Sequence, residues 1–255
     1  MNLEGKTYIV TGSSMGIGEA IARRIVKLNG RVLVHGLEND LTETVANSLG
    51  MPYIVGDLSL PSVCEGIIAK AMEEFGEIHG LVNNAGAVLR NLIEENDADF
   101  WDRVMNINAR APMLLIRAAL KPLSVSKGYV VNIGSVNAYS GEPNLLAYSA
   151  SKGALMTMTR NLGDTLHRDY GIKVNQINPG WVLSEGEKKR KIAEGMDADW
   201  FSKLGKDEAP SGRMISPEDI AFTTVNFLTD QFGPISGQVI ELSQFPFIGR
   251  NAPKC

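Results

Sequence analysis

The sequence contains little cysteine and histidine, and this scarcity excludes two classes of protein. Two cysteines in 255 residues, Cys64 and Cys255, cannot form a disulfide framework. The cysteines and histidines show no metal-ligand spacing, so we expect no metal site. The three histidines, His35, His79 and His167, fall in predicted strands or helices, and we expect them to be structural.

Long apolar runs and an excess of basic charge are also missing. No apolar run approaches the ~18 residues of a membrane helix, so we expect no membrane span. The chain has 25 Lys and Arg against 29 Asp and Glu, a net charge of −4, and no basic stripe. Nucleic acid is therefore not an expected partner. Residues 1–6 contain no charged segment leading into an apolar one, so we expect no signal peptide and a cytoplasmic location.

What the chain does contain is a regular alternation of two patterns. Short runs rich in Val and Ile predict strands. Amphipathic helical patterns lie between them, most clearly over residues 16–28 and 154–166. Strands alternating with helices predict a parallel sheet covered on both faces. Because no linker or repeat interrupts the series, we predict one doubly wound α/β domain over residues 1–255, with about seven strands. The predicted strands are residues 7–10, 31–35, 52–55, 78–82, 128–133, 172–177 and 238–242.

Tyr148 and Lys152 are four residues apart in a predicted helix. This spacing places the phenol and the ammonium on one face. A free tyrosine has a pKa near ~10, and an ammonium within ~4–6 Å lowers it by roughly one to three units. Such a pair suits a general acid/base that exchanges a proton with a substrate oxygen. The spacing alone also fits an ordinary Tyr and Lys on an exposed helix face.

A glycine-rich loop, residues 11–18, follows the first predicted strand and opens the first predicted helix. Glycines allow a sharp turn and a close approach of the backbone to a pyrophosphate, and the helix N-terminus favours negative charge. The spacing alone also fits a structural turn. Its position between a strand and a helix is the context that nucleotide loops require.

With these features the chain resembles the short-chain dehydrogenase/reductase family over essentially its whole length. Asn108 and Ser135 fall where the family has its active-site asparagine and serine, the serine 13 residues before Tyr148. The other similar elements are the loop at 11–18, the N-N-A-G sequence at 83–86, the N-P-G turn at 178–180, and residues 212–213 with 217–221. The resemblance implies a Rossmann-type fold and an oxidoreductase that uses NAD or NADP.

The resemblance gives roles to four catalytic residues. Tyr148 would protonate a carbonyl oxygen during reduction or accept the hydroxyl proton during oxidation. Ser135 would hydrogen-bond the same oxygen and stabilise its developing charge. Lys152 would lower the pKa of the tyrosine and bind the nicotinamide ribose. Asn108 would hold a water molecule that links Lys152 to solvent. The hydride chemistry itself belongs to the cofactor.

The resemblance also implies a cofactor site. Amides near Gly12, Ser14 and Ile17 would face the diphosphate, and Gly18 would pack against the sheet. Asp57 would accept a hydrogen bond from the adenine amino group, and Ser184, usually threonine in the family, would bind the carboxamide. The full set is Gly12, Ser14, Met15, Gly16, Ile17, Gly18, Leu37, Asp57, Leu58, Asn84, Ala85, Gly86, Tyr148, Lys152, Pro179, Gly180, Val182 and Ser184.

The choice between NAD and NADP rests on the end of the second strand. NAD-preferring relatives usually have an aspartate there, where this chain has Gly36. NADP-preferring relatives offer Arg or Lys at the positions of Leu37 or Met15. Glu38 lies close enough to accept a ribose hydroxyl and would repel a phosphate. NAD is therefore favoured, although Glu38 also fits an exposed loop residue.

The substrate is predicted less directly. The family's lid corresponds to about residues 181–214, and its basic run 188–191 reads as a solvated helix face, with anion binding as the alternative. The pocket candidates are Val136, Asn137, Tyr139, Glu142, Asn144, Leu145, Trp181 and Glu185. Their polar groups favour a small-molecule alcohol or ketone such as a sugar or polyol. An acyl-carrier-protein ketone is the alternative.

Two expectations concern assembly and catalysis. The family's usual D-G-G is missing after the last strand, and the apolar residues Phe245, Phe247 and Ile248 need cover. A neighbouring subunit would supply it, so we expect a homotetramer or homodimer. A non-catalytic sensor or scaffold is possible on the same fold. Such proteins usually lose the tyrosine, the lysine or a loop glycine, all of which are present here. An epimerase or dehydratase with bound NAD would generally need a longer chain.

Overall fold

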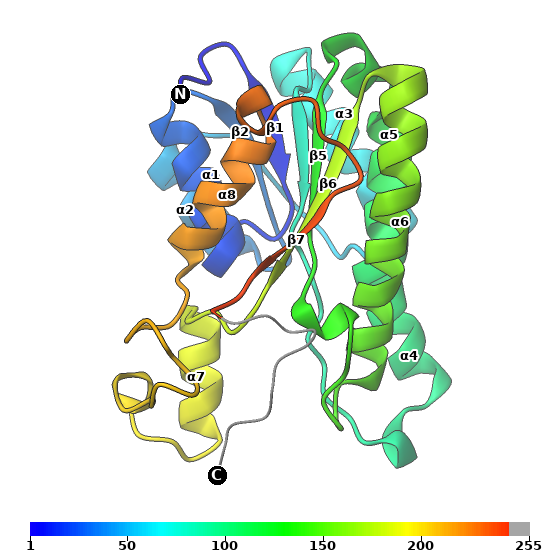
Figure 1. Ribbon diagram of the computed structural model, residues 1–255. Helices are drawn as coiled ribbons and strands as arrows, with labels where there is room; N and C mark the ends of the chain where they lie inside the picture. Colours follow the sequence, from blue (N-terminus) through cyan, green and yellow to red (C-terminus); the bar gives the residue numbers. More distant parts are fainter. Residues whose placement is uncertain (245–255) are drawn as a thin grey trace.

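Seven parallel strands form the centre of the molecule (Figure 1). The computed structural model describes residues 1–244. Their order in the sheet is β3-β2-β1-β4-β5-β6-β7, and every neighbouring pair is parallel. All the predicted strands are present, which confirms the doubly wound α/β fold. The strands are β1 (Thr7–Val10), β2 (Arg31–Gly36), β3 (Tyr53–Val55), β4 (Gly80–Asn83), β5 (Tyr129–Ile133), β6 (Lys173–Pro179) and β7 (Val239–Leu242).

Two layers of helices cover the sheet, because successive strand residues point to opposite faces. Val10 belongs to the core beneath α1 (Gly16–Lys27), α2 (Asn39–Leu49) and α8 (Pro217–Phe227). Ile9 belongs to the other core, beneath α3 (Pro61–Phe75), α5 (Ala111–Ser126) and α6 (Leu146–Tyr170). Apolar burial on both faces therefore fixes the register of each strand.

The carboxyl ends of the strands meet at one edge of the sheet. The strand order reverses between β1 and β4, which is where ligands bind in folds of this kind. Two further elements stand beyond that edge in Figure 1: α4 (Ala98–Met105) and α7 (Glu185–Ala193). A π-helical turn, Asn106–Arg110, joins α4 to α5.

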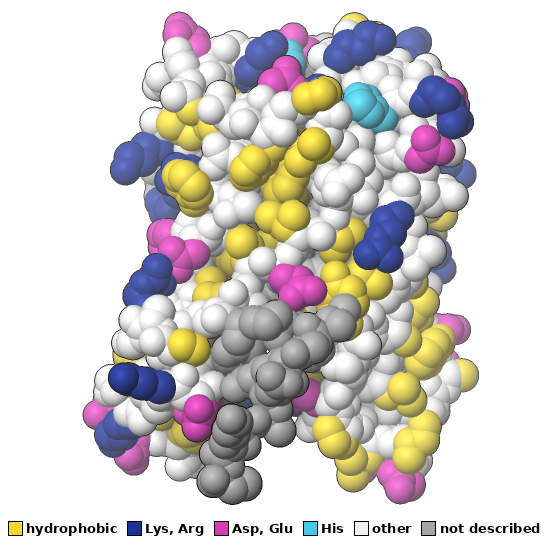
Figure 2. Space-filling model, viewed as in Figure 1, with side chains coloured by type: hydrophobic (Ala, Val, Ile, Leu, Met, Phe, Trp, Pro, Cys, Tyr) yellow, Lys and Arg dark blue, Asp and Glu magenta, His cyan; other side chains and the backbone are white. Residues whose placement is uncertain are grey.

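The surface mixes charges of both signs, with apolar side chains exposed between them (Figure 2). Within residues 1–244 no helix combines the length and apolar character needed to cross a bilayer. That same part of the chain brings together no group of three metal-ligating side chains. The apolar residues 245–248, for which we expect a covering subunit, lie outside the described residues.

Candidate active site

Lys152 and Tyr148 lie one turn apart on α6, as their spacing predicts. The Lys152 side chain is buried, with 4% of its surface exposed, and its Nζ donates a hydrogen bond to the Ile133 carbonyl at 2.8 Å. Its Nζ lies 5.7 Å from the centroid of the Tyr148 ring. Burial lowers the pKa of Lys152 to about 8. The ammonium is therefore held inside the protein against the end of β5.

Tyr148 is buried as well, and the expected lowering of its pKa is wrong for this structure. Burial raises the pKa of Tyr148 above its ordinary value, and this effect exceeds the opposing hydrogen bond with Ser135. The charge of Glu142 raises the pKa further and that of Arg90 lowers it. The Lys152 ammonium points to the Ile133 carbonyl, so desolvation dominates. The phenol is consequently protonated at neutral pH.

Asn108 lies in the π-helical turn, a feature that is common at functional sites. Its side-chain amide is fully engaged. Oδ1 accepts from the Ala87 amide at 2.7 Å, and Nδ2 donates to the Ala87 carbonyl and to Ser151 Oγ, both at 3.0 Å. A Cβ built on Gly86 would lie 3.5 Å from both Asn108 Oδ1 and Lys152 Nζ. Asn108 thus fixes the loop after β4 beside the lysine. Its water-binding role remains a prediction.

Two side chains hold the glycine-rich loop in place. Asn84 Nδ2 donates to the carbonyls of Thr11 and Gly12 at 2.9 and 3.0 Å. His35 Nδ1 accepts from the Gly12 amide at 3.2 Å, while Nε2 lies 3.1 Å from the Gly56 carbonyl. Burial lowers the pKa of His35 to about 4, so the ring is neutral and donates through Nε2. His35 is therefore a structural residue, as expected, and its role is to hold the glycine-rich loop in position.

The loop has the geometry of a dinucleotide cradle. Gly12 has a φ of 62°, and a Cβ on Gly12 would lie 2.9 Å from the Ala85 Cα. A Cβ on Gly18 would lie 2.1 Å from the Gly12 carbonyl oxygen, so Gly18 packs against the loop itself. No side chain caps the N-terminus of α1, where Met15 is the N-cap. Its first amides are thus available to an anion such as a pyrophosphate.

The adenosine end of the predicted site lies at β2 and β3. A Cβ on Gly36 would lie 2.1 Å from Thr42 Oγ1 and 2.7 Å from Ser14 Oγ, so the position usually occupied by aspartate admits no side chain. The Leu37 side chain is 60% exposed. The Asp57 carboxylate accepts a hydrogen bond from the Ser59 amide and forms an ion pair with Arg103.

Leu58 and Met15 differ in what they offer a cofactor. The Leu58 side chain is buried in the core with Cys64 and Ile67, so only its backbone is available there. The Met15 side chain is half exposed beside α1. Neither side chain carries charge.

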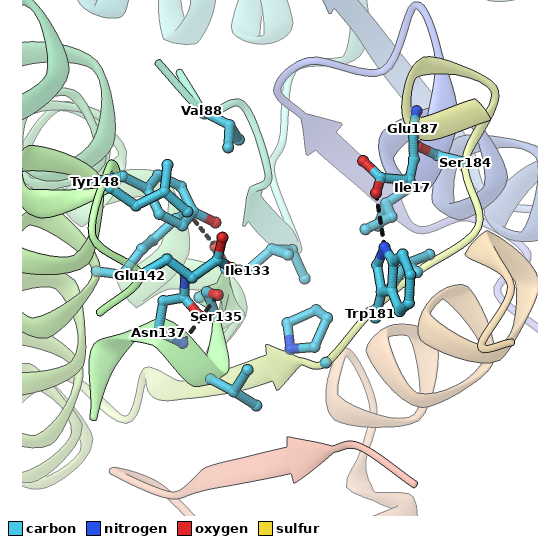
Figure 3. A pocket seen from close by; sticks show the side chains of 18 of the residues that line it. Ile17, Val88, Ile133, Ser135, Asn137, Glu142, Tyr148, Trp181, Ser184 and Glu187 are labelled. Atoms are coloured by element: carbon cyan, nitrogen blue, oxygen red, sulfur yellow. Dashed lines mark hydrogen bonds between the residues drawn. The ribbon is translucent and has the colours of Figure 1, made fainter. Parts of the chain in front are cut away.

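A cavity of about 780 Å³ lies between Tyr148, Lys152 and the start of α1 (Figure 3), and neither the adenosine-end residues Gly36, Leu37, Asp57 and Leu58 nor Met15 line it. Tyr148, Ser135, Asn137 and Glu142 lie on one side of it, facing Trp181, Ser184, Glu187 and Ile17. The cofactor candidates that line the cavity are Ile17, Asn84, Gly86, Tyr148, Lys152, Pro179, Gly180, Val182 and Ser184. The pocket candidates that line it are Val136, Asn137, Glu142, Asn144, Leu145 and Trp181, while Tyr139 and Glu185 do not.

The helix α7 forms one wall of this cavity. Ser184 is its N-cap and accepts a hydrogen bond from the Glu187 amide at 3.1 Å, leaving its own proton free to bind a carboxamide. Trp181 Nε1 donates to Glu187 Oε1 at 2.7 Å, and the Trp181 ring stacks on Trp200 with a centroid distance of 5.2 Å. The indole is thus fixed to both α7 and the segment that follows it.

The basic run on α7 is only partly solvated, so that expectation needs correction. Arg190 and Lys191 line the cavity, whereas Lys189 is exposed. Arg190 binds Glu187 through two hydrogen bonds, at 2.9 and 2.6 Å, and also pairs with Glu194. Because the helical period is 3.6 residues, the four residues of the run are spread around α7, and only part of the run faces the cavity. Because carboxylates of the same helix neutralise it, the run offers little free positive charge.

Arg90 belongs to the site, and sequence reasoning missed it. It lies in the loop after β4 and lines the cavity. Its Nη1 donates to Glu142 Oε2 at 3.1 Å and to Asn144 Oδ1 at 3.0 Å. Its Nε is buried without a hydrogen-bond partner in the described part of the chain. The sequence feature that could have indicated this residue is its position, four residues after the N-N-A-G element.

Comparisons with known proteins identify the family and support the fold. The family model described as short chain dehydrogenase matches residues 6–195. An uncharacterized oxidoreductase of Thermotoga maritima is 32% identical, over 95% of this chain and 97% of that protein. A 3-oxoacyl-[acyl-carrier-protein] reductase of Rickettsia felis is 33% identical, over 95% and 97%. The crystal structure of L-sorbose reductase from Gluconobacter frateurii, complexed with NADPH and L-sorbose, has a TM-score of 0.88 and 25% identity, covering 95% and 97%.

The buried His35 predicts a defined dependence of stability on pH. The folded pKa of about 4 is below the ordinary 6.5, so between these values the unfolded chain binds a proton that the folded chain does not. The stabilisation is present above pH 6.5 and is lost as the pH falls towards 4. We expect His35 to account for about 2 kcal/mol of the loss between pH 7 and 5. Urea unfolding of the wild type and His35→Asn at both pH values measures it. Equal losses in the two proteins would contradict the assignment.

Proposed function

The chain belongs to the short-chain dehydrogenase/reductase family, and on that premise we propose that Tyr148, Ser135 and Lys152 are its catalytic groups. The chain is an NAD(P)-dependent oxidoreductase that interconverts secondary alcohols and ketones. The observation that carries the residue assignment is the meeting of all three side chains in the cavity that also contains Ile17 of the glycine-rich loop.

The protein's part in the reaction is to position and to transfer a proton. The bound nicotinamide supplies or accepts the hydride. In reduction the Tyr148 phenol, protonated because of its raised pKa, donates its proton to the carbonyl oxygen. The Ser135 hydroxyl donates a hydrogen bond to the same oxygen as its negative charge develops. Ser135 Oγ accepts from the Asn137 amide at 3.1 Å, which leaves its proton to be donated to Tyr148 in the free protein and to the substrate oxygen when substrate binds.

Lys152 provides positive charge beside the phenol. With a pKa of about 8 it is mostly protonated at neutral pH. Its charge favours the phenolate that remains after Tyr148 has given up its proton. Its remaining N–H groups are available to the ribose hydroxyls. Asn108 keeps the loop with Gly86 against this ammonium.

For the cofactor we favour NAD over NADP. The exposed side chains at positions 37 and 15 are Leu and Met, and neither carries charge for a 2′-phosphate. Glu38 follows Leu37 and adds a negative charge at the N-terminus of α2. The L-sorbose reductase was solved with NADPH, so NADP is the alternative.

For the substrate we favour a neutral sugar or polyol. Arg90 and Glu142 place a donor and an acceptor side by side on the cavity wall, and both act on the pKa of Tyr148. Hydroxyl groups can satisfy both at once. A hydrocarbon chain would cover this ion pair without offering either partner a further hydrogen bond, and a substrate carboxylate would be repelled by Glu142. The L-sorbose complex supports the same class. The Rickettsia felis reductase, by its name, makes an acyl-carrier-protein ketone the alternative.

We also expect residues 181–214 to act as a lid, and the protein to form a homotetramer or homodimer in the cytoplasm. Apolar side chains gather in Figure 2 over the region where Figure 1 places α4, and Trp101 of α4 is partly exposed. Exposed apolar groups of this size are typical of association surfaces.

The proton-transfer role predicts that Tyr148→Phe lowers kcat by roughly 10²–10⁴-fold, because the substitution removes the phenol proton that is transferred to the carbonyl oxygen. The dissociation constant of NADH, followed by fluorescence, should change by less than about threefold. Lys152→Ala is the matched variant and should weaken both turnover and NADH binding. Tyr148→Phe retaining more than about a third of wild-type kcat would remove the tyrosine from this role.

The cofactor assignment predicts that Leu37→Arg improves NADPH relative to NADH by about tenfold or more, since a charge-assisted hydrogen bond contributes roughly 1.5–3 kcal/mol. Leu37→Gln, without charge, is the control. The readout is kcat/KM for both cofactors in all three proteins. A wild type that prefers NADPH by more than about tenfold would show that other groups bind the 2′-phosphate.

The substrate assignment predicts that Arg90→Met and Glu142→Gln lower kcat/KM for ketohexoses by about tenfold or more. Reduction of 2-hexanone, which has the carbon chain without the hydroxyls, should change by less than about threefold. The probes are D-fructose, L-sorbose, 2-hexanone and acetoacetyl-CoA. Equal losses on ketohexoses and 2-hexanone would refute the hydroxyl contacts. A wild-type preference for acetoacetyl-CoA would instead favour the acyl alternative.

A further inference from the structure

Polar residues occupy the middle of the sheet, where apolar ones are expected. Strands β4, β5 and β6 are covered on both faces, and such strands are usually apolar throughout. Yet Asn83, Asn132, Gln176 and Asn178 lie in them, each 2% exposed or less. Buried amides are costly unless they are hydrogen-bonded. The hydrogen-bond partners of these four side chains therefore indicate why polar residues occupy these positions.

These side chains form a continuous series of contacts across three strands and α6. Asn83 Nδ2 donates to Asn132 Oδ1 at 2.8 Å, and Asn132 Nδ2 donates to Thr159 Oγ1 at 2.8 Å. The Thr159 hydroxyl lies 2.8 Å from Gln176 Oε1 and 2.9 Å from the Leu155 carbonyl, so the two acceptors share its proton. The series thus joins β4 and β5 to β6 through the helix that carries Tyr148.

The series ends at the backbone of Ser135. Gln176 Nε2 donates to Asn178 Oδ1 at 2.7 Å, and the Ser135 amide donates to the same oxygen at 3.1 Å. A Cβ on Gly134 would lie 2.0 Å from Asn178 Oδ1 and 2.3 Å from Gln176 Nε2. The Asn178 side chain therefore crosses over residue 134 to reach Ser135, and only glycine leaves room for it.

Ser135 is consequently held from two sides. Asn178 fixes its amide, and the Asn137 amide binds its Oγ at 3.1 Å. The backbone of Ser135 is extended, with φ −167° and ψ 152°. A rotation there would carry the hydroxyl away from Tyr148. A displacement of about 1 Å in a group of this kind can cost about 10²-fold in rate.

We propose that Asn178, supported by Gln176, is a positioning residue that sets the Ser135 hydroxyl against the reacting oxygen. It touches neither substrate nor cofactor in this role and acts through Ser135. The proposal rests on the proposed function in that it takes Ser135 to bind the substrate oxygen. The Asn178 Nδ2 atom has no hydrogen-bond partner within residues 1–244, so the acceptor oxygen is the part that matters.

A double-mutant cycle tests the proposal. Asn178→Ala should lower kcat for the fastest-reduced ketone of the probe panel by about tenfold or more in the wild-type background. In the Ser135→Ala background the same change should cost less than about twofold, because nothing is left to position. Equal fold-losses in the two backgrounds would overturn the proposal. A Ser135→Ala protein with wild-type kcat would instead refute the role of Ser135 in the proposed function.

Two variants separate positioning from general loss of structure. Asn178→Asp keeps an acceptor oxygen and should recover most of the lost kcat. Thr159→Val removes an equally buried member of the series whose described hydrogen bonds go to neither Asn178 nor Ser135, and should lower the melting temperature with less than about threefold change in kcat. A loss in Thr159→Val as large as that in Asn178→Ala would make the series merely structural and overturn the proposal.

A measurement without substrate completes the test. The Ser135 amide should be protected from hydrogen exchange in the free protein, because it donates to Asn178 Oδ1. Asn178→Ala should lose that protection by about tenfold or more, while the Val131 amide in β5, the strand that precedes Ser135, stays protected. Unchanged protection of Ser135 in Asn178→Ala would show that Asn178 does not hold it.

Discussion

The desolvated ammonium of Lys152 is the constraint on which the site depends. The side chain is almost entirely buried, and the one hydrogen bond described for it goes to the Ile133 carbonyl. A buried positive charge is unfavourable, which is why the pKa falls to about 8. The surrounding groups are arranged around it: Gly86 leaves space beside it, and Asn108 fixes that loop. We propose that the same charge stabilises the phenolate that forms when Tyr148 gives up its proton, so that an unfavourable burial assists proton transfer.

The parallel sheet brings this charge to the cofactor side. The carboxyl ends of all seven strands lie at one edge, and segments that follow β4, β5, β6 and β7 supply most of the cavity wall. Neighbouring atoms lie so close to Gly12, Gly18 and Gly134 that a side chain at any of these positions would clash. At Gly18 and Gly134 the close neighbours include polar side chains, Asn84 and Asn178, which pass directly over the glycine backbone. Asn84 and His35 fix the nucleotide loop in this way. The geometry of the site is thus built from close packing at the strand ends.

Much of this arrangement follows from the sequence. The Val- and Ile-rich runs predicted all seven strands within a few residues, because burial on both faces demands apolar residues at fixed spacing. The Tyr148–Lys152 spacing placed both groups on one helix face. The pKa direction of Tyr148 did not follow, since desolvation depends on everything packed around the ring. The sequence did not show that Arg90 lines the cavity, nor that Arg190 and Lys191 of α7 do, because the orientation of loops and of α7 is set by tertiary contacts. Polar residues in buried strands, such as Gln176, were a visible signal.

The central claim is that a buried ammonium at position 152 sets the electrostatics of the site. Its most direct test is the pKa of Lys152 in the free protein, from the pH dependence of its ¹³Cε chemical shift in lysine-labelled protein. Lys152→Arg removes the resonance and assigns it. We expect a pKa of about 8. A value at or above the ordinary ~10.4 would show that the ammonium is solvated, and would contradict the account.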